Sequence, residues 1–371
     1  APAVVSEADL FLRLCPAPTI GITGTEGKTT TASLTAALLA ADSSHPVVLG
    51  GNIGTPLVER LWELTPNHRV VIELSELQLP TLSRGTTVAV YTNVTADHLD
   101  RHGSLDAYRR VKRRLAELLP AEGTLVLNAD DPVVAEYASL AAGRTVMYGL
   151  GALRSGGVGV VDDWITADSG GRVMPLSELR IPGRHNVSNA LAAVSVALLF
   201  GVAPESVRRA AGEFRGVEHR LEEVATIDGV RFVNDSQGTQ PDAVIAALRA
   251  FEPPVVLIAG GRDKGVDLGE LPSVVAERAA AAVVIGESGP ALGERFADAG
   301  LRRVERAETL DAAVELAEAI ARATRHDDGI ATVLLSPAAA SFDMFVDYAE
   351  RGRAFKAAVA RRAAARTGTA E

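Results

Sequence analysis

Short apolar runs alternate with longer segments of helical periodicity through most of the chain. In its first part the pattern predicts strands that begin near Ile20 and at 46–49, 70–74, 88–92, 125–128 and 145–148. Between these strands it predicts helices at 29–41, 55–63, 105–118 and 132–142. This alternation indicates a mostly parallel sheet with helices on both faces, and ligands of such sheets bind at the carboxyl ends of the strands.

The pattern changes at 151–182, which is rich in glycine and holds short alternating segments at 157–161 and 173–176, predicted as small antiparallel strands. Helices are predicted next at 186–200 and 204–212. The alternation then restarts, with strands predicted at 221–225, 230–234, 255–259, 282–285 and 331–335 and helices at 241–250, 271–280, 290–299, 310–323 and 348–365.

We therefore expect an α/β protein of two domains. Residues 19–213 are predicted to form a first domain with a mostly parallel sheet, and 214–371 a doubly wound (Rossmann-like) α/β domain. Residues 1–18 hold one short amphipathic segment, 7–14, followed by Pro16 and Pro18, and we expect them to be the linker or remnant of an N-terminal domain.

Composition narrows the class of protein. A formal net charge of −10 disfavours non-specific binding to nucleic acid, which needs a basic face. The longest apolar run, 191–200, is about half of what crosses a bilayer. The single cysteine, Cys15, cannot form an internal disulfide. We expect a cytoplasmic protein that binds neither nucleic acid nor membrane.

The segment 19–31, TIGITGTEGKTTT, predicts a strand, a glycine-rich turn and a helix start. Backbone N–H groups and the positive end of a helix then face one point, which suits a polyphosphate. Lys28 would reach the terminal phosphates and the Thr29 hydroxyl would hold Mg²⁺. The alternative is an ordinary glycine-rich turn. The predicted nucleotide-binding residues are Gly24, Thr25, Glu26, Gly27, Lys28, Thr29 and Thr30.

Three further polar groups are expected on the same domain. Glu73 ends an apolar strand, where it could bind Mg²⁺ or be a solvated charge. His98 lies in the loop 92–102, TNVTADHLDRH, and is either a metal or phosphate ligand or structural. Lys112 has arginines around it in YRRVKRR, which is either a solvated face or an anion-binding patch. Like charges favour the neutral amine of Lys112, which can react with CO₂ to give a carbamate.

Polar residues at the proposed boundary and beyond it suggest the rest of a ligand site. Asn186 and Asn189 lie three residues apart at a helix start, where they could bind an adenine edge or cap the helix. Arg220 could contact a transferring phosphoryl group or be a surface charge. Asp235 ends a strand and could accept a hydrogen bond from a ribose. Lys264 follows the next strand, which predicts an anionic second ligand.

The order of these motifs resembles the Mur ligase family, whose members add amino acids to peptidoglycan precursors. The motifs are TGTEGKTT, GGNIGTP, IELSELQL, TNVTADHLDRH, YRRVK, LNADD, GRHNVSNALAA, EHRLE, NDSQGT and LLSPAAASFDMF. The resemblance is strongest to the D-glutamate-adding branch. It implies a three-domain fold in which 19–213 form the central P-loop-type ATPase domain and 214–371 the C-terminal domain, while this chain lacks the N-terminal UDP-binding domain.

The resemblance also implies the site. ATP would bind with two Mg²⁺ ions held by Thr29, Glu73, His98 and a carbamylated Lys112. The catalytic residues would be Lys28, Lys112, His98 and Arg220. Adenine would be contacted by Asn186 and Asn189, the γ-phosphate by Arg220 and the ribose by Asp235. Asn52 would contact the nucleotide sugar, and the D-glutamate pocket would contain Thr239, Lys264, Ser336 and Phe342.

The implied activity is an ATP-dependent addition of D-glutamate to UDP-N-acetylmuramoyl-L-alanine through an acyl phosphate, by a monomer. It would serve peptidoglycan synthesis, and with it cell-wall biogenesis, cell shape and division. Three residues depart from the family pattern: Glu26 in the phosphate loop, Glu76, and Gln237 where a lysine is usual. Two alternatives remain, a ligase like folylpolyglutamate synthase and a non-catalytic ATP-binding remnant.

Overall fold

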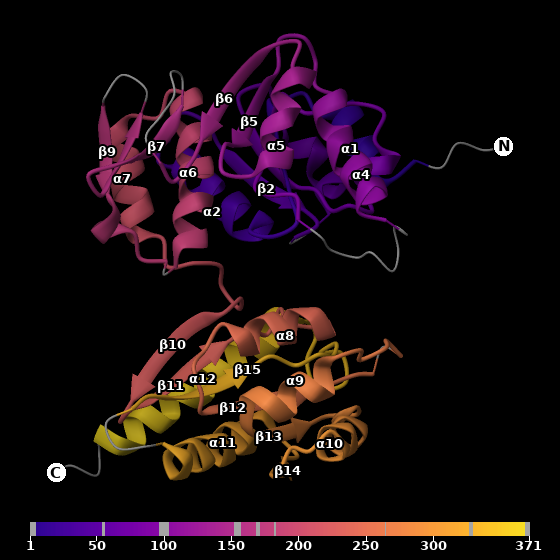
Figure 1. Cartoon of the computed structure of the whole chain (residues 1–371), viewed down its shortest axis with the longest axis vertical. Helices are drawn as coiled ribbons and strands as arrows, with labels where there is room; N and C mark the ends of the chain where they lie inside the picture. The colour runs from indigo at the N-terminus through magenta and orange to yellow at the C-terminus, as the bar shows by residue number, and fades with distance from the viewer. Residues whose placement is uncertain are drawn as a thin grey trace. The chain divides into compact units, whose positions relative to one another are not determined.

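The computed structural model describes residues 5–53, 56–95, 104–151, 157–167, 171–181, 183–263, 265–325 and 329–367. The chain forms two compact units, Ala1–Gly216 and Val217–Glu371, each with its own sheet (Figure 1). Both sheets are mostly parallel and covered by helices on both faces, so the predicted α/β fold class is confirmed. None of the helices in the described ranges is long and apolar enough to cross a bilayer.

The first unit contains a nine-stranded sheet in the order β2-β3-β1-β4-β5-β6-β7-β8-β9. The strands are β1 (Thr19–Thr23), β2 (Val47–Gly51), β3 (Arg69–Glu73), β4 (Val88–Tyr91), β5 (Thr124–Asn128), β6 (Arg144–Tyr148), β7 (Val158–Val161), β8 (Trp164–Ala167) and β9 (Arg172–Pro175). β8 pairs antiparallel with β7 and β9, and the other pairs are parallel. The antiparallel segments predicted at 157–161 and 173–176 are confirmed as β7 and β9.

Two helical layers cover this sheet. One face packs against α2 (Lys28–Ala40), α6 (Arg184–Leu199) and α7 (Pro204–Glu213). The other packs against α1 (Glu7–Leu14), α4 (Leu105–Glu117) and α5 (Pro132–Glu136). The α-helix predicted at 55–63 is wrong, because Leu57–Glu63 forms a 3₁₀ helix, η1. In that helix residues three apart eclipse each other, and Arg60 and Glu63 form an ion pair of 2.8 Å.

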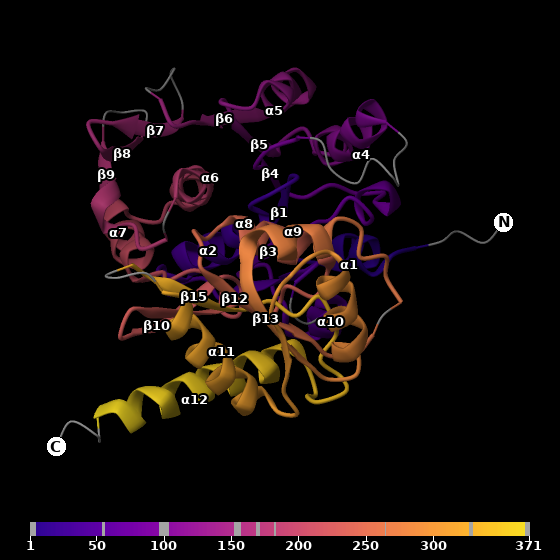
Figure 2. The same ribbon diagram turned by 60° about the horizontal axis from the view of Figure 1, so that its bottom comes forward.

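The sheet of the second unit has the order β10-β11-β15-β12-β13-β14, with only β10 antiparallel. Its strands are β10 (Glu222–Ile227), β11 (Val230–Asn234), β12 (Val255–Gly260), β13 (Ala279–Ile285), β14 (Val304–Arg306) and β15 (Ala331–Leu335). One face carries α8 (Pro241–Arg249), α9 (Leu271–Arg278) and α10 (Gly289–Asp298). The other carries α11 (Leu310–Thr324) and α12 (Tyr348–Thr367), which run side by side (Figure 2). This arrangement is doubly wound, as predicted.

Candidate nucleotide and metal site

The phosphate loop, residues 24–27, joins the buried central strand β1 to α2. Gly24 and Gly27 have φ of 155° and 78°, and a Cβ at Gly27 would overlap the Asn189 amide. Only glycine fits at position 27 without strain, because the backbone there is left-handed and the Asn189 amide fills the space that a Cβ would need. Gly27 is also the N-cap of α2 and has no side chain to cap the first turn, which begins at Lys28. A helix start of this kind attracts anions.

The end of β4 holds this loop in place. The Thr25 N–H donates to the Asn93 carbonyl at 2.8 Å, and the Glu26 N–H donates to Asn93 Oδ1 at 2.9 Å. Thr92 Oγ1 donates to the Glu26 carbonyl at 2.6 Å. The Glu26 side chain itself is exposed, so this departure from the family pattern faces solvent. Lys28 Nζ donates to the Thr25 carbonyl at 2.6 Å.

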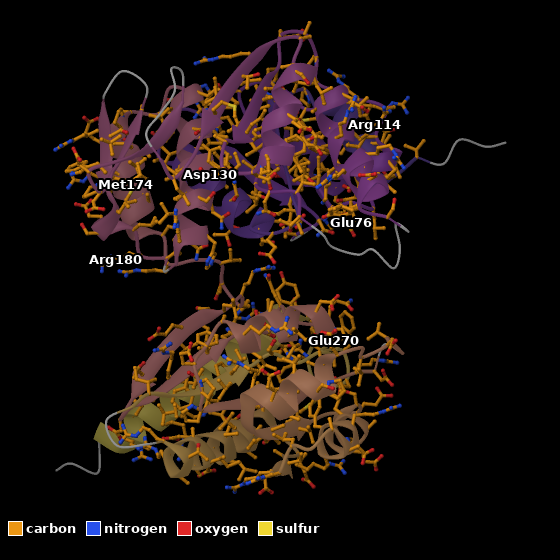
Figure 3. The ribbon with its side chains drawn as sticks, in the orientation of Figure 1. Glu76, Arg114, Asp130, Met174, Arg180 and Glu270 are labelled. Atoms are coloured by element: carbon orange, nitrogen blue, oxygen red, sulfur yellow. The ribbon has the colours of Figure 1, made fainter. Side chains whose placement is uncertain are left out.

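Glu73, the last residue of β3, brings a buried carboxylate beside the strand that leads into the loop. Its Oε1 accepts from Asn52 Nδ2 at 3.0 Å, whereas its buried Oε2 has no hydrogen-bond partner. A buried carboxylate oxygen in this state fits a hard cation such as Mg²⁺. Asn52, predicted to contact a nucleotide sugar, thus contacts Glu73. Glu76 is buried in the turn after β3 (Figure 3).

The other predicted metal ligands are Thr29, His98 and Lys112. Thr29 is buried in the first turn of α2, and Thr30 beside it is half-buried. His98 lies outside the described residues. Among the residues that are described, no three His, Cys, Asp or Glu side chains gather so as to hold a metal by themselves. A metal held by the described residues would therefore need other ligands as well, such as a hydroxyl, a modified lysine or a phosphate.

Lys112 is fully buried although it lies in a strongly basic helix. Its Nζ donates to the Gly24 carbonyl at 2.8 Å and lies 5.2 Å from the centre of the Tyr108 ring. The Tyr108 hydroxyl in turn lies 3.0 Å from Thr25 Oγ1. Arg113, next to the lysine, is exposed and pairs with Glu117 at 2.8 Å. The basic run is thus a solvated face from which one lysine turns inward to the phosphate loop.

Asn186 and Asn189 connect α6 to the same loop. Asn189 is buried, its Nδ2 donates to Asn186 Oδ1 at 3.1 Å, and its Oδ1 accepts from Thr31 Oγ1 at 3.3 Å. Since Thr31 lies in the first turn of α2, the two amides predicted to share a helix face lie beside the phosphate loop. Their position near a nucleotide site therefore comes from packing between α2 and α6.

In the second unit, Arg220 lies in a tight turn before β10. The residues on both sides of it, His219 and Leu221, have left-handed backbones with φ of 65° and 44°. The His219 N–H donates to Glu222 Oε2 at 2.9 Å, and the Leu221 N–H donates to Asp235 Oδ1 at 3.2 Å. Such conformations cost free energy and persist because the surroundings impose them. The turn therefore constrains the backbone that carries the exposed Arg220.

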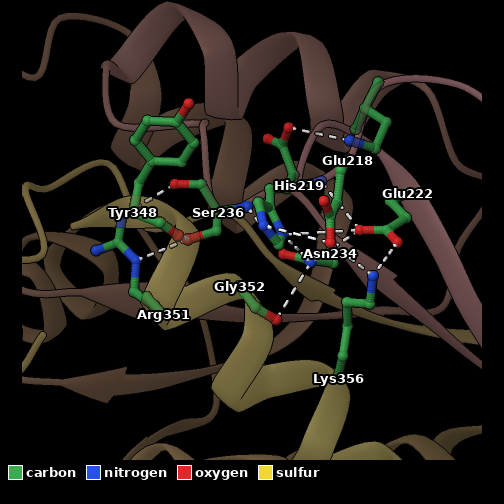
Figure 4. A network of polar contacts seen from close by, with 11 residues as sticks. Glu218, His219, Glu222, Asn234, Ser236, Tyr348, Arg351, Gly352 and Lys356 are labelled. Atoms are coloured by element: carbon green, nitrogen blue, oxygen red, sulfur yellow. Dashed lines mark hydrogen bonds and ion pairs between the residues drawn. The ribbon is translucent and has the colours of Figure 1, made fainter. Parts of the chain in front are cut away.

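The His219 ring anchors this turn (Figure 4). Its Nδ1 lies 2.9 Å from Asn234 Nδ2, and burial lowers the pKa of the imidazole. The ring packs against Gly352, where an added Cβ would overlap it. Lys356 Nζ closes the network by donating to Glu222 Oε1 at 2.7 Å. A neutral, buried histidine thus ties the Arg220 turn to β11 and α12.

Asp235 follows β11 and is buried beside the turn. Its Oδ2 accepts from Ser336 Oγ at 2.6 Å. Burial raises the pKa of the Asp235 carboxyl to about 6, against the opposing effects of Ser336 and Arg220. Ser336, predicted in a D-glutamate pocket, is fully buried and contacts Asp235. The hydrogen bond from the Ser336 hydroxyl orients the Asp235 carboxylate.

Of the other residues predicted for the D-glutamate pocket, the structure describes Thr239 and Phe342. Thr239 is half-buried in the loop after β11, and its N–H donates to the Gln237 carbonyl at 2.7 Å. Phe342 follows β15 and is 65% exposed. Lys264 lies outside the described residues. The structure therefore brings together Arg220, Asp235 and Ser336.

Arg351, which was not predicted from the sequence as a functional residue, is fully buried in α12 (Figure 4). Its guanidinium donates to Ser236 Oγ at 3.0 Å and to the carbonyls of Ser236 and Ala339 at 2.9 and 3.3 Å. These contacts join the segments that follow β11 and β15. An arginine in a polar helix reads as a surface residue, so no local signal indicated this role.

Comparisons with known proteins agree over both units. Residues 22–197 match the Mur ligase middle domain, and 219–339 match the Mur ligase glutamate ligase domain. The UDP-N-acetylmuramoylalanine--D-glutamate ligase of Symbiobacterium thermophilum is 40% identical over 96% of this chain and 78% of its own length. The same-named enzyme of Desulfitobacterium hafniense (strain DSM 10664 / DCB-2) is 41% identical over the same shares.

Solved structures show the same fold. MurF from Acinetobacter baumannii superposes with a TM-score of 0.64 at 20% identity, over 93% of this chain and 78% of that one. A pseudomurein peptide ligase type C from Methanothermus fervidus gives 0.57 at 21% identity, over 86% and 76%. With relatives near 40% identity along almost its whole length, the chain belongs to the Mur ligase family.

Proposed function

We propose that this protein is an ATP-dependent ligase that adds D-glutamate to UDP-N-acetylmuramoyl-L-alanine. One observation carries the chemistry: a phosphate loop flanked by the buried Lys112, bonded to Gly24, and by Glu73 with its unpartnered oxygen. The choice of substrates rests on the names of the relatives that are 40–41% identical.

The reaction would take place in two steps. The L-alanyl carboxylate attacks the γ-phosphorus of ATP, which forms an acyl phosphate and releases ADP. The amine of D-glutamate then attacks the acyl carbon, the tetrahedral intermediate expels phosphate, and the nitrogen loses a proton. Lys28 and Arg220 would counter negative charge on the transferred phosphoryl group, and positioning would supply much of the rate. Asn186 and Asn189 would contact adenine, and Asp235 the ribose.

Magnesium fits the first unit. Thr29, Glu73 and a carbamylated Lys112 would hold it, together with His98. Bound Mg²⁺ would neutralise charge on the phosphates. The carbamate forms when the neutral amine of Lys112 adds to CO₂ and releases a proton. Its oxygens are the hard ligands that Mg²⁺ prefers, and they would replace the contact of Nζ with the Gly24 carbonyl.

Substrate dependence tests the proposal directly. With ATP, Mg²⁺ and UDP-N-acetylmuramoyl-L-alanine, phosphate release should require D-glutamate, with L-glutamate as the control. A malachite-green assay gives the rate, and mass spectrometry identifies the dipeptide product. Release that depends on a folyl-glutamate acceptor would favour the folylpolyglutamate synthase alternative. No release with any amino acid would favour the non-catalytic remnant.

ATP affinity should depend on pH through Asp235. Only the ionised carboxylate accepts two hydrogen bonds from a ribose, so Mg-ATP should bind more weakly as pH falls below about 6. Calorimetric titrations across this range measure the effect, and Asp235→Asn should remove it. Because the Ser336 hydroxyl stabilises the ionised form, Ser336→Ala should move the midpoint to higher pH. An unshifted midpoint in both variants would exclude Asp235 as the titrating group.

The Asp235 carboxyl also makes folding stability depend on pH, but with the opposite sign: its contribution to stability falls as pH rises, whereas ATP affinity rises. Its folded-state pKa, about 6, lies above its ordinary value of 3.8, so the folded protein binds this proton more tightly than the unfolded chain does. The stabilisation is complete below the ordinary value and is lost as pH rises to about 6. Above that pH the buried Asp235 carboxylate is charged, which costs free energy of folding. Ligand binding at this site can offset that cost.

A further inference from the structure

Tyr91, at the end of β4, places its hydroxyl inside the hydrogen-bond ladder of α4. The hydroxyl donates to the Lys112 carbonyl at 2.8 Å and accepts from the Ala116 N–H at 2.9 Å. These two backbone groups are four residues apart and are the pair that an uninterrupted α-helix would join. The Tyr91 hydroxyl thus bonds to both backbone groups of one helical turn, and that turn contains Lys112.

Tyr91 is fixed at both ends. Its ring is fully buried and lies edge-on to the Tyr137 ring, with 5.1 Å between their centres. Its backbone carbonyl accepts from the Tyr148 hydroxyl at 2.9 Å. Burial raises the pKa of the Tyr91 hydroxyl well above its usual range, so the group keeps the proton that it donates. The position of this hydroxyl therefore sets the position of the helix turn.

The next residues of the same strand end hold the phosphate loop. Thr92 contacts the Glu26 carbonyl, and Asn93 contacts the Thr25 and Glu26 N–H groups. One short segment, 91–93, therefore joins the loop on one side and the Lys112 turn on the other. The Lys112 turn and the phosphate loop therefore share one support, and Lys112 Nζ lies 2.8 Å from the Gly24 carbonyl.

We propose that Tyr91 is a positioning residue that sets the place of Lys112 against the phosphate loop. The catalytic consequence rests on the proposed function, in which Lys112 is carbamylated and holds Mg²⁺. The placement itself does not, because it follows from the two hydrogen bonds of the Tyr91 hydroxyl. Without the hydroxyl, this turn of α4 would lose its hydrogen bonds to the end of β4, and Lys112 would move away from the loop.

Tyr91→Phe tests the placement, because it removes only the hydroxyl. A displacement of the order of 1 Å at a catalytic group lowers turnover by up to about a hundredfold, so we expect a ten- to hundredfold lower kcat. The KM for UDP-N-acetylmuramoyl-L-alanine should change by less than about twofold. The ¹³C NMR signal of a carbamate formed from labelled bicarbonate should weaken in parallel.

Tyr137→Phe is the matched control. Its hydroxyl donates to another carbonyl of α4, that of Arg109, at 3.3 Å, within the same cluster of rings. This variant should keep its kcat and its carbamate signal. Equal losses in both variants would show a general effect of packing and overturn the proposal. So would a Tyr91→Phe variant with unchanged kcat.

Two further measurements separate the possible failures. If Tyr91→Phe folds poorly, 4-aminophenylalanine at position 91 keeps a donor toward the Lys112 carbonyl and should recover most of the kcat; continued loss would contradict the proposal. If the parent protein shows no ligase activity, the proposed function fails, and a crystal structure of Tyr91→Phe still tests the placement. Lys112 Nζ should then have left the Gly24 carbonyl, and an unmoved lysine would refute the inference.

Discussion

Lys112→Ala is expected to lower kcat by roughly 10²–10³, the loss typical of removing one group that stabilises charge in the transition state. Lys112 is fully buried and aimed at the Gly24 carbonyl, so the substitution empties a site beside the phosphates. A small carboxylate can enter that space and supply the oxygens of the missing carbamate. Acetate or propionate should therefore restore part of the rate, which a titration of each acid against phosphate release would measure.

Arg113→Ala is the control for this experiment. Arg113 is the next residue on α4 and is exposed. Its ion pair with Glu117 lies at the surface, where such pairs contribute little to stability. Its loss should leave kcat unchanged and should give no response to added acid. If Lys112→Ala were as active as the parent, the carbamate role would be refuted. If acid raised both variants equally, the effect would belong to the buffer and not to the vacated site.

Arg220→Lys should lower kcat by about 10³ even though the charge is kept. A guanidinium that stabilises a transferring phosphoryl group contributes about 10³–10⁵ in rate. A lysine lacks the fork of donors that binds two phosphate oxygens at once, and its shorter reach from the fixed turn cannot compensate. The KM for D-glutamate should remain within a few-fold, and initial rates at saturating ATP would separate the two parameters.

Arg353→Ala controls for general electrostatics, because Arg353 is an exposed residue of α12 whose charge acts on Glu218 and His219. We expect this variant to behave as the parent does. A comparable loss of kcat in both would mean that net positive charge near the His219 network matters, and not the contact made by Arg220. Full activity of Arg220→Lys would show that a point charge is enough.

Much of the fold was predictable because buried parallel strands have continuous apolar sequences. β1, β3 and β5 are buried along their whole length, and the middle of each is free of polar side chains: IGI, VVI and LVL. β8 was missed because it is only four residues long and follows a turn at Asp162 and Asp163 with left-handed backbones. β14 was missed because it is a three-residue edge strand with the polar sequence VER.

The candidate site, too, has a part that could be predicted from the sequence and a part that could not. The phosphate loop is contiguous, so its glycines and Lys28 identify it from sequence alone. The supports are not contiguous: Tyr91 acts on residues 21 and 25 positions away, and Ser336 on a residue 101 positions away. No local pattern contains such contacts. Tyr91 reads as one more apolar strand residue, and Ser336 reads as a free hydroxyl at a strand end, where the resemblance suggested a substrate contact.

The two units should also differ in when they can fold. β1 is an interior strand of its sheet and is made before both strands that pair with it, so the first unit can add its neighbours as translation proceeds. β15 lies between β11 and β12 but is made after all the other strands of its sheet. Until it leaves the ribosome, β11 and β12 each present an unpaired edge that invites pairing with another chain. The nascent second unit is therefore the part of this protein that most needs protection by chaperones.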